Sequence, residues 1–382
     1  MKIKQVEIDS LFGRDGIITL KFHDDINVLT GKNGAGKTNI LKLIWYIISG
    51  NIDKAIEEIN FRSCYIITDK YEIRVNLISR NFCNVHFVSE ETGAVQFIDY
   101  EDEHDNFTVS AEHEANQHIK NIGSSVFLPT FRRIEGGFTL DGRQNNTFYR
   151  KVTKNEIEEA LNKLSLHLSN NDHFFVTSIS SVDISNLLLK QYTRISEYSN
   201  EIQKIQAENI ISSISSFSQK ADSQKEGELS EAIKLIEDIK TQIEYSETLR
   251  NNEMKPLLEV QKVVQKIFKK SGIEFTKKIT FGDAATAIKS NLLSAGEKQM
   301  LSFICYNAFY NDTIFFIDEP ELSLHVDWQR RLFLTLNQQN PSNQFIITTH
   351  SPFIYSKYPE KEVCVDIQKD KGNSENLGEN NE

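Results

Sequence analysis

The sequence of 382 residues has few of the features that mark several common classes of protein. No apolar run approaches the roughly 20 residues that cross a bilayer, and the first residues alternate charged and apolar side chains, unlike a signal peptide. Cysteine is scarce, and its four positions show no metal-ligand spacing: Cys64, Cys83, Cys305 and Cys364. These absences argue against a membrane protein or a disulfide framework and predict a cytoplasmic protein with buried, reduced cysteines.

The sequence also lacks the positive charge of a protein that coats nucleic acid. It has 43 basic and 54 acidic side chains, which gives a net charge of −11. This balance argues against nucleic-acid binding by bulk charge and leaves a local basic groove open. The best local candidate for a DNA contact, with a solvated helix face as its alternative, is the cluster Lys266, Lys269, Lys270, Lys277 and Lys278.

A complete phosphate-binding loop lies near the start of the chain. Gly31–Thr38 matches G-x-x-x-x-G-K-[ST], between the buried-strand pattern Ile26–Leu29 and a helical repeat of apolar residues. Glycines let successive backbone N–H groups point at phosphate oxygens, and the next helix presents its positive end to the same charge. Lys37 can then bridge the β- and γ-phosphates, while the Thr38 hydroxyl is a ligand for Mg²⁺. The predicted nucleotide contacts are Asn33, Gly34, Ala35, Gly36, Lys37, Thr38 and Asn39.

A second carboxylate-bearing element lies in the last quarter of the chain. Thr313–Pro320 is an apolar strand pattern that ends in Asp318 and Glu319. Because carboxylates at the end of a buried strand are costly without a cation, we predict that Asp318 holds Mg²⁺ through water. Glu319 would orient or polarise the attacking water. The alternative is a pair of acids that cap the following helix.

Three further segments follow the order of the motifs in one family of ATPases. Leu293–Glu297 resembles the ABC signature, Glu321–His325 resembles the D-loop, and Phe345–His350 resembles the strand that leads to the switch histidine. On these motifs the chain resembles ABC/SMC/RecF-type ATPases. The resemblance implies hydrolysis of ATP with Mg²⁺, a role for His350 in sensing the γ-phosphate, and a homodimer or higher oligomer. In such a dimer Ser294 and Gly296 would contact the nucleotide of the other protomer.

The fold class that follows is α/β: an ABC-type P-loop NTPase head, with a mixed sheet flanked by helices and a helical insertion. Residues 1–150 and 281–368 would form the head, 151–280 a helical lid or short coiled-coil hairpin, and 369–382 a disordered tail. Apolar residues at helical spacing predict one stripe on each of two amphipathic helices. They are Ile202, Ile205, Ile211 and Ile214, then, after a polar turn, Leu229, Ile233, Ile236, Ile239 and Ile243. For the Q-loop glutamine, Gln96 and Gln144 are candidates without a supporting pattern.

The distances between the motifs separate subclasses of the family. The signature follows the phosphate loop by far more residues than in a transporter ATPase, and the helical stretch is too short for a long SMC arm. Too few residues follow His350 for the metal-binding nuclease domain of OLD proteins. We therefore expect an ATPase without nuclease activity of its own.

The segment Val126–Arg133 resembles stand-alone ATPases of bacterial anti-phage operons of the Septu, PARIS and retron types. This resemblance implies a nucleotide-gated scaffold that controls a separate nuclease or toxin. Arg132 and Arg133 would face nucleotide, a partner or DNA, or form a solvated pair. The alternatives are a RecF-like DNA repair ATPase and a structural scaffold with slow or absent hydrolysis.

Overall fold

The computed structural model describes residues 1–32, 34–79, 82–99, 110–130, 160–161, 163–177, 181–221, 228–268 and 294–365. The chain divides into two compact units. The sheet unit comprises 1–179, 295–300 and 310–382, and the hairpin unit comprises 180–294 and 301–309. Asn33, Arg132, Arg133 and Gln144, together with most of the predicted basic cluster and the predicted tail, lie outside the described residues.

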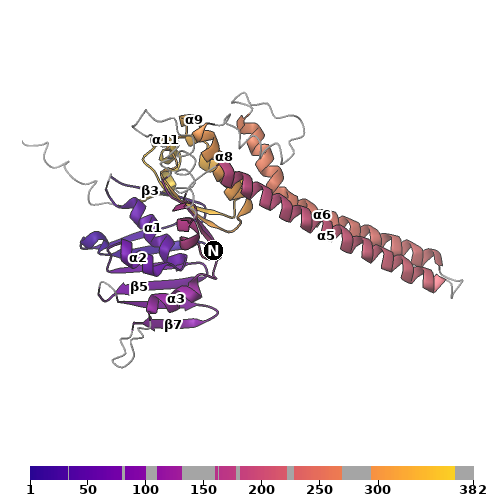
Figure 1. The fold of residues 1–382 in the computed structure, drawn as a ribbon, viewed down its shortest axis with the longest axis horizontal. Coiled ribbons are helices and arrows are strands. Elements are labelled where there is room, and N and C mark those ends of the chain that lie inside the picture. Colours follow the sequence, from indigo (N-terminus) through magenta and orange to yellow (C-terminus); the bar gives the residue numbers. More distant parts are fainter. Residues whose placement is uncertain are drawn as a thin grey trace, which may run out of the picture. The chain divides into compact units, whose positions relative to one another are not determined.

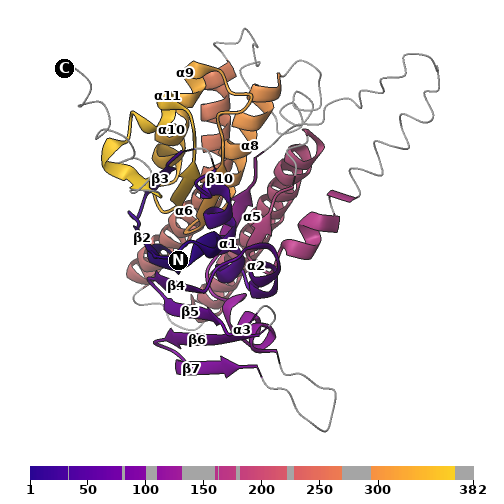
Figure 2. The same ribbon diagram turned by 90° about the vertical axis from the view of Figure 1, so that its left-hand side faces the viewer.

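The first sheet of the sheet unit is antiparallel, in the order β2-β1-β4-β5-β6-β7. Its strands alternate buried and more exposed residues, as expected where one face packs on a core and the other meets solvent. Helix α3 (Ala111–Ile119) lies against β6 and β7, as Figure 2 shows. The strands are β1 (Ile3–Asp9), β2 (Ile17–Lys21), β4 (Ser63–Thr68), β5 (Tyr71–Leu77), β6 (Cys83–Ser89) and β7 (Gly93–Ile98).

The second sheet is parallel throughout, in the order β12-β3-β11-β10-β8-β9. Every residue of β10 and β11 is buried, which explains the unbroken apolar runs of these two strands. Parallel strands place their carboxyl ends at one edge, where α/β proteins bind ligands. The strands are β3 (Ile26–Thr30), β8 (Ser125–Leu128), β9 (His173–Phe175), β10 (Ile314–Asp318), β11 (Gln344–Thr348) and β12 (Glu362–Cys364).

Helix α1 (Lys37–Ile48) belongs to a single hydrophobic core with side chains from both sheets. Nearly all its residues after the first turn are buried, because the helix is apolar around its whole circumference. Gly50 follows it with a φ of 71°, a left-handed conformation that ends the helix at little cost for glycine. The packing of α1 therefore holds the loop before it at the edge of the parallel sheet.

Short helices connect the remaining strands of the sheet unit. They are η1 (Leu11–Gly13), α2 (Ile52–Glu58), α9 (Val326–Gln329), α10 (Leu332–Gln339), α11 (Pro352–Tyr355) and η3 (Pro359–Lys361). Helix α8 (Ala295–Phe309) begins in the sheet unit and continues in the hairpin unit. The expected α/β fold is confirmed, with the parallel and antiparallel strands sorted into two sheets.

The hairpin unit contains two long helices, α5 (Ser181–Ala221) and α6 (Glu228–Phe268), which run side by side in opposite directions (Figure 1). The two predicted apolar stripes do not line the contact between the two helices. Ile202 and Ile239 are partly buried. The other described members of the two stripes are exposed by 36 to 65%: Ile205, Ile211, Ile214, Ile233, Ile236 and Ile243. Helical spacing identifies residues that share a face, and it does not identify the face that meets the other helix.

Two other expectations about the chain can be compared with the structure. All four cysteines are free, and Cys64, Cys83 and Cys305 are buried, as small apolar groups should be. Neither hairpin helix, nor any other helix within the described ranges, has the apolar length that crossing a bilayer requires.

Two buried hydrogen bonds join helix α1 to strands β8 and β9 of the parallel sheet. Trp45 Nε1 donates to Ser125 Oγ at 3.0 Å, and Ser125 Oγ lies 2.7 Å from His173 Nδ1. Ser125 Oγ accepts from the tryptophan and can donate its own proton to Nδ1 of a neutral imidazole. Burial lowers the pKa of His173 to about 4.

This pKa makes the stability of the sheet unit pH-dependent. The pKa of histidine in an unfolded chain is about 6.5. Between pH 6.5 and about 4, His173 is therefore protonated in the unfolded chain and neutral in the folded chain. The contribution of His173 is therefore complete above pH 6.5 and is lost as pH falls, by up to about 3 kcal/mol. Urea unfolding at several pH values should show this slope, and His173→Gln should flatten it. An unchanged slope in the variant would assign the effect to other groups.

Candidate nucleotide site

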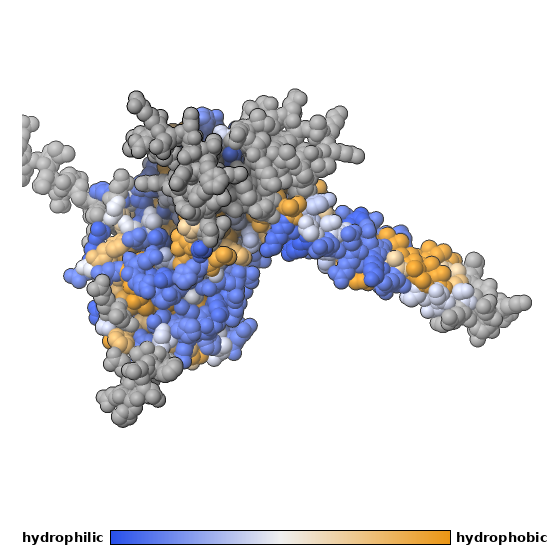
Figure 3. Space-filling view, in the orientation of Figure 1, coloured by the Kyte–Doolittle hydropathy of each residue, from blue (hydrophilic) through white to orange (hydrophobic). Residues whose placement is uncertain are grey.

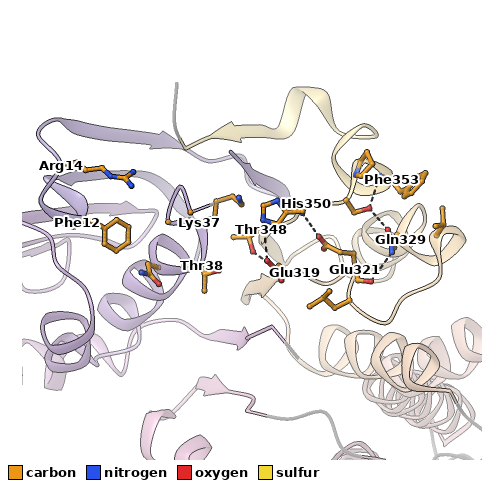
Figure 4. Close-up of a pocket in the computed structure, with 17 residues that line it drawn as sticks. Phe12, Arg14, Lys37, Thr38, Glu319, Glu321, Gln329, Thr348, His350 and Phe353 are labelled. Carbon is orange, nitrogen blue, oxygen red and sulfur yellow. Dashed lines mark hydrogen bonds and ion pairs between the residues drawn. The ribbon is translucent and has the colours of Figure 1, made fainter. Parts of the chain in front are cut away.

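A pocket of about 970 Å³ lies at the carboxyl edge of the parallel sheet (Figure 4). Three segments supply most of its wall: the phosphate loop with the start of α1, the chain after β10, and the chain after β11. The phosphate-loop residues in the wall are Gly34, Gly36, Lys37, Thr38 and Asn39. Ala35 is buried behind them. Sequence-distant segments therefore meet where the motifs predicted a nucleotide site.

Asp318 ties these segments together. Thr38 Oγ1 donates to its carboxylate, at 3.0 Å from Oδ1 and 3.2 Å from Oδ2. The hydroxyls of Thr348 and Thr130 donate to the same carboxylate. Thr348 is the register partner of Asp318 across β10 and β11, and Thr130 follows β8 on the other side. Three hydroxyl donors from three segments thus compensate a carboxylate that is only 3% exposed.

The end of the phosphate loop, at Gly36, packs closely against η1. Gly36 has a φ of 93°, and a Cβ atom there would lie 2.5 Å from Cε2 of the Phe12 ring. Only glycine adopts this φ without strain and leaves space for the Phe12 ring. Lys37 Nζ donates to the carbonyl oxygens of Gly31 at 2.8 Å and Lys32 at 3.2 Å. Burial lowers the pKa of Lys37, and the nearby carboxylates of Glu319 and Asp318 oppose this effect.

Glu319 and His350 face each other across the pocket. Their side chains approach to 3.8 Å between Oε1 and Nε2, and both remain partly exposed. Glu319 has a φ of 47°, unusual for a residue with a side chain. Its backbone N–H donates to the carbonyl oxygen of Thr348 at 3.0 Å, which holds this conformation in place. Strained backbone of this kind is often found at functional sites.

A second set of contacts joins the segment after β10 to His350. The backbone N–H of His350 donates to Glu321 Oε1 at 2.7 Å. Gln329 Nε2 donates to the carbonyl oxygen of Leu324 at 2.8 Å, and Gln329 Oε1 accepts from Ser351 Oγ at 2.6 Å. The amide of Gln329 therefore links the residues that resemble the D-loop to the residue after the switch histidine.

The donor chemistry of this site fits Mg²⁺. The ion prefers hard oxygen ligands, and the Thr38 hydroxyl and Asp318 carboxylate are already adjacent. Cys83, Asp99 and Glu112 form another cluster of ligand-type side chains in the described part of the chain. There both oxygens of Asp99 accept backbone N–H groups, from Cys83 and Ala111, each at 2.6 Å. That cluster therefore closes a loop and does not resemble an ion site.

The signature residues lie at the start of α8. Ser294 is exposed and directly precedes the helix. Gly296 is buried, and a Cβ atom there would lie 2.3 Å from the carbonyl oxygen of Ser323. Gln299 Nε2 also donates to the carbonyl oxygen of Pro320 at 3.3 Å. The signature helix is thus packed against the segment after Asp318, and Gly296 is not in the pocket wall.

Several wall residues carried no signal in the sequence. Phe12, Arg14, Gln329 and Phe353 match no motif, because each is brought to the pocket by the packing of a loop or a short helix. Thr130 is not in the wall and joins the site through its hydrogen bond to Asp318. Thr130 does lie in the segment Val126–Arg133, but there the sequence pointed to Arg132 and Arg133 as the residues that would face nucleotide, a partner or DNA. In contrast, Gln96 occupies an exposed position of β7 in the antiparallel sheet and does not line the pocket.

The family model for the AAA ATPase domain matches residues 1–355 of this chain. The chain belongs to this family. It is therefore an ATPase by family, and the pocket described above is lined by residues of its phosphate loop. The comparison does not favour the RecF-like alternative.

Solved structures of SMC head domains are also similar. One from Pyrococcus furiosus, with an extended coiled coil and bound to the C-terminal domain of ScpA, has 13% identity and a TM-score of 0.36. The match covers 93% of this chain and 91% of that one. A head from Thermotoga maritima has 11% identity and a TM-score of 0.33, with 93% and 92% covered.

Gln329 offers a test of the link between the two segments. Gln329→Ala should leave the KM for ATP within about twofold and lower kcat about tenfold, because His350 loses its positioning while the phosphate contacts remain. Steady-state ATPase assays would measure both. Ser351→Ala removes the other partner of the same bond, so the double variant should be little worse than either single one.

Gln338, an exposed glutamine of α10, supplies the matched control. Gln338→Ala should leave both constants unchanged. Additive effects of Gln329→Ala and Ser351→Ala, or an equal loss in the control, would contradict the link.

Proposed function

We propose that this ATPase binds ATP with Mg²⁺ in the pocket beside Lys37 and hydrolyses it with Glu319 and His350. The observation that carries the proposal is the convergence on Asp318 of hydroxyls from three segments, next to Glu319 and His350. Bound Mg²⁺ would supply charge stabilisation at the phosphates and would be held by Thr38 and Asp318. Asn33, Gly34, Gly36 and Asn39 would contribute to phosphate and nucleotide contacts around it.

The residues of the chain divide the remaining work. Lys37 binds the β- and γ-phosphates, replacing its present bonds to loop carbonyls. Glu319 accepts a hydrogen bond from the attacking water and orients it toward the γ-phosphate. His350, 3.8 Å from Glu319, is placed to bond the γ-phosphate on the same side. These roles require water to reach Glu319, whose side chain is partly exposed.

We further propose that two copies share each nucleotide. Ser294 is exposed at the start of α8, and Gly296, which has no side chain, lets this helix start pack closely against the Ser323 carbonyl of its own chain. Ser294 and the N-terminus of α8, a helix of 15 residues, suit the γ-phosphate of a nucleotide bound to another copy. ATP would then hold a homodimer together, and hydrolysis would release it.

The biological role we propose is control of a separate nuclease or toxin in anti-phage defence. Support comes from the segment Val126–Arg133, which resembles ATPases of anti-phage operons. The ATP-bound dimer would hold the partner, and hydrolysis or release of nucleotide would free it.

The shared site can be tested with Glu319→Gln. This variant should bind ATP normally and hydrolyse it about a hundredfold more slowly, because the glutamine cannot polarise water as a carboxylate does. It should accumulate as a nucleotide-bound dimer in sedimentation experiments. Adding Ser294→Arg should abolish that dimer while ATP binding persists, and Lys37→Ala should remove binding itself. A dimer that forms normally with Ser294→Arg would show that the site is not shared.

The partner is tested by co-expression with the products of the neighbouring genes. We expect a nuclease or toxin to co-purify with Glu319→Gln in ATP and to be lost from Lys37→Ala. Mass measurement of the complexes with and without ATP would give the stoichiometry. Equal co-purification of the partner with and without ATP would contradict control by ATP. Hydrolysis of ATP that is stimulated by DNA, without any protein partner, would indicate a role in DNA repair.

A further inference from the structure

Asp318 is buried, unlike most charged groups of the sheet unit. Hydrophilic residues cover much of the visible surface of this unit (Figure 3), whereas Asp318 is only 3% exposed. A buried carboxylate is costly unless its oxygens accept hydrogen bonds. The two oxygens of Asp318 accept from different residues, and this division shows how the orientation of the carboxylate is fixed.

The hydroxyls of two threonines hold the carboxylate from opposite sides. Thr348 Oγ1 donates to Oδ1 of Asp318, and Thr130 Oγ1 donates to Oδ2. Thr348 belongs to β11 and Thr130 follows β8, and these two strands flank β10, which ends at Asp318. The third hydroxyl, that of Thr38, is shared between both oxygens. Rotation of the carboxylate about its Cβ–Cγ bond would therefore break the bonds to Thr130 and Thr348.

Strand β8 fixes the position of Thr130. Every residue of this strand is buried. Its last residue, Leu128, is the register partner of Ile317, which directly precedes Asp318. Pro129 comes next, and because proline has no N–H it cannot donate to a further bond of the ladder. The strand ends there, and the side chain of the following residue, Thr130, bonds to Asp318.

Thr130 and Thr348 differ in their other contacts at the site. The Thr348 hydroxyl also accepts the backbone N–H of Glu319 at 3.3 Å, and the Thr348 side chain lines the pocket. Thr130 does not line the pocket and reaches the site through Asp318. A change at Thr130 therefore alters the support of Asp318 and leaves the pocket wall intact.

A carboxylate holds a metal ion best when its own hydrogen bonds fix its orientation. Under the proposed function, Asp318 and Thr38 hold Mg²⁺. We propose that Thr130 is a positioning residue for Mg²⁺ and acts through Oδ2 of Asp318. This inference rests on the proposed function and deepens it, since the affinity of the site for Mg²⁺ then depends on a residue outside the pocket wall.

The test measures how Mg²⁺ supports the binding of a fluorescent ATP analogue to the full chain. Thr130→Val removes the hydroxyl from a side chain of similar shape, so the Mg²⁺ concentration for half-maximal binding should rise about tenfold. Binding of the analogue in EDTA should stay within about twofold of the wild type, because the phosphate loop is unchanged. Thr130→Ser keeps a hydroxyl and should restore most of the affinity for Mg²⁺.

Thr313→Val is the matched control. Thr313 is also a buried threonine, directly before β10 at the opposite end of the strand, and its hydroxyl donates to the carbonyl oxygen of Asn311 at 2.9 Å. This variant should leave the Mg²⁺ dependence unchanged, even where it lowers thermal stability. Thr130→Ala should match Thr130→Val, which keeps the test valid if the valine variant is unstable. Circular dichroism would establish that each variant is folded.

Three results would overturn the inference: an unchanged Mg²⁺ dependence in Thr130→Val, an equal rise in Thr313→Val, or a loss of analogue binding in EDTA as large as the loss in Mg²⁺. Failure of Thr130→Ser to restore the affinity for Mg²⁺ would also overturn it. Thr38→Val separates this inference from the proposed function. If Thr38→Val loses the Mg²⁺ dependence and Thr130→Val keeps it, the proposed Mg²⁺ site stands and the role of Thr130 falls. If Mg²⁺ has no effect on the wild-type chain, both fall.

Discussion

The carboxylate of Asp318 is the point on which the site depends. A buried charge without partners costs several kcal/mol, so the fold must bring donors to it. They come from α1, from the chain after β8 and from the end of β11. These segments are adjacent only because β10 lies between β11 and β8 in the parallel sheet. The same arrangement holds the phosphate loop beside the acid that follows β10.

The residues that follow Asp318 connect it to the rest of the pocket wall. Glu319 turns in a left-handed conformation directly after Asp318, and Glu321 reaches the backbone of His350. Gln329 then joins this segment to Ser351. Gly296 packs against Ser323 on the other side of the same segment. The start of α8 is therefore connected to His350 through its packing on Ser323 and the hydrogen bond from His350 to Glu321.

Membership of the AAA ATPase domain family agrees with this chemistry, and it leaves the biological role to be decided by partners. The hairpin is the part of the chain that differs most from what catalysis requires. Its exposed isoleucines do not line the pocket.

The sequence alone determined the phosphate loop, the strand ending in Asp318 and Glu319, and the α/β order of elements. Each depends on local chemistry: glycines where the backbone must curl, and an unbroken apolar run where a strand is covered on both faces. Tertiary structure alone decided that Phe12, Thr130 and Gln329 belong to the site, since no local pattern reports which loops will meet. It also decided which isoleucines of the hairpin face outward. Periodicity relates a side chain to its neighbours on one helix, and only packing shows what lies opposite.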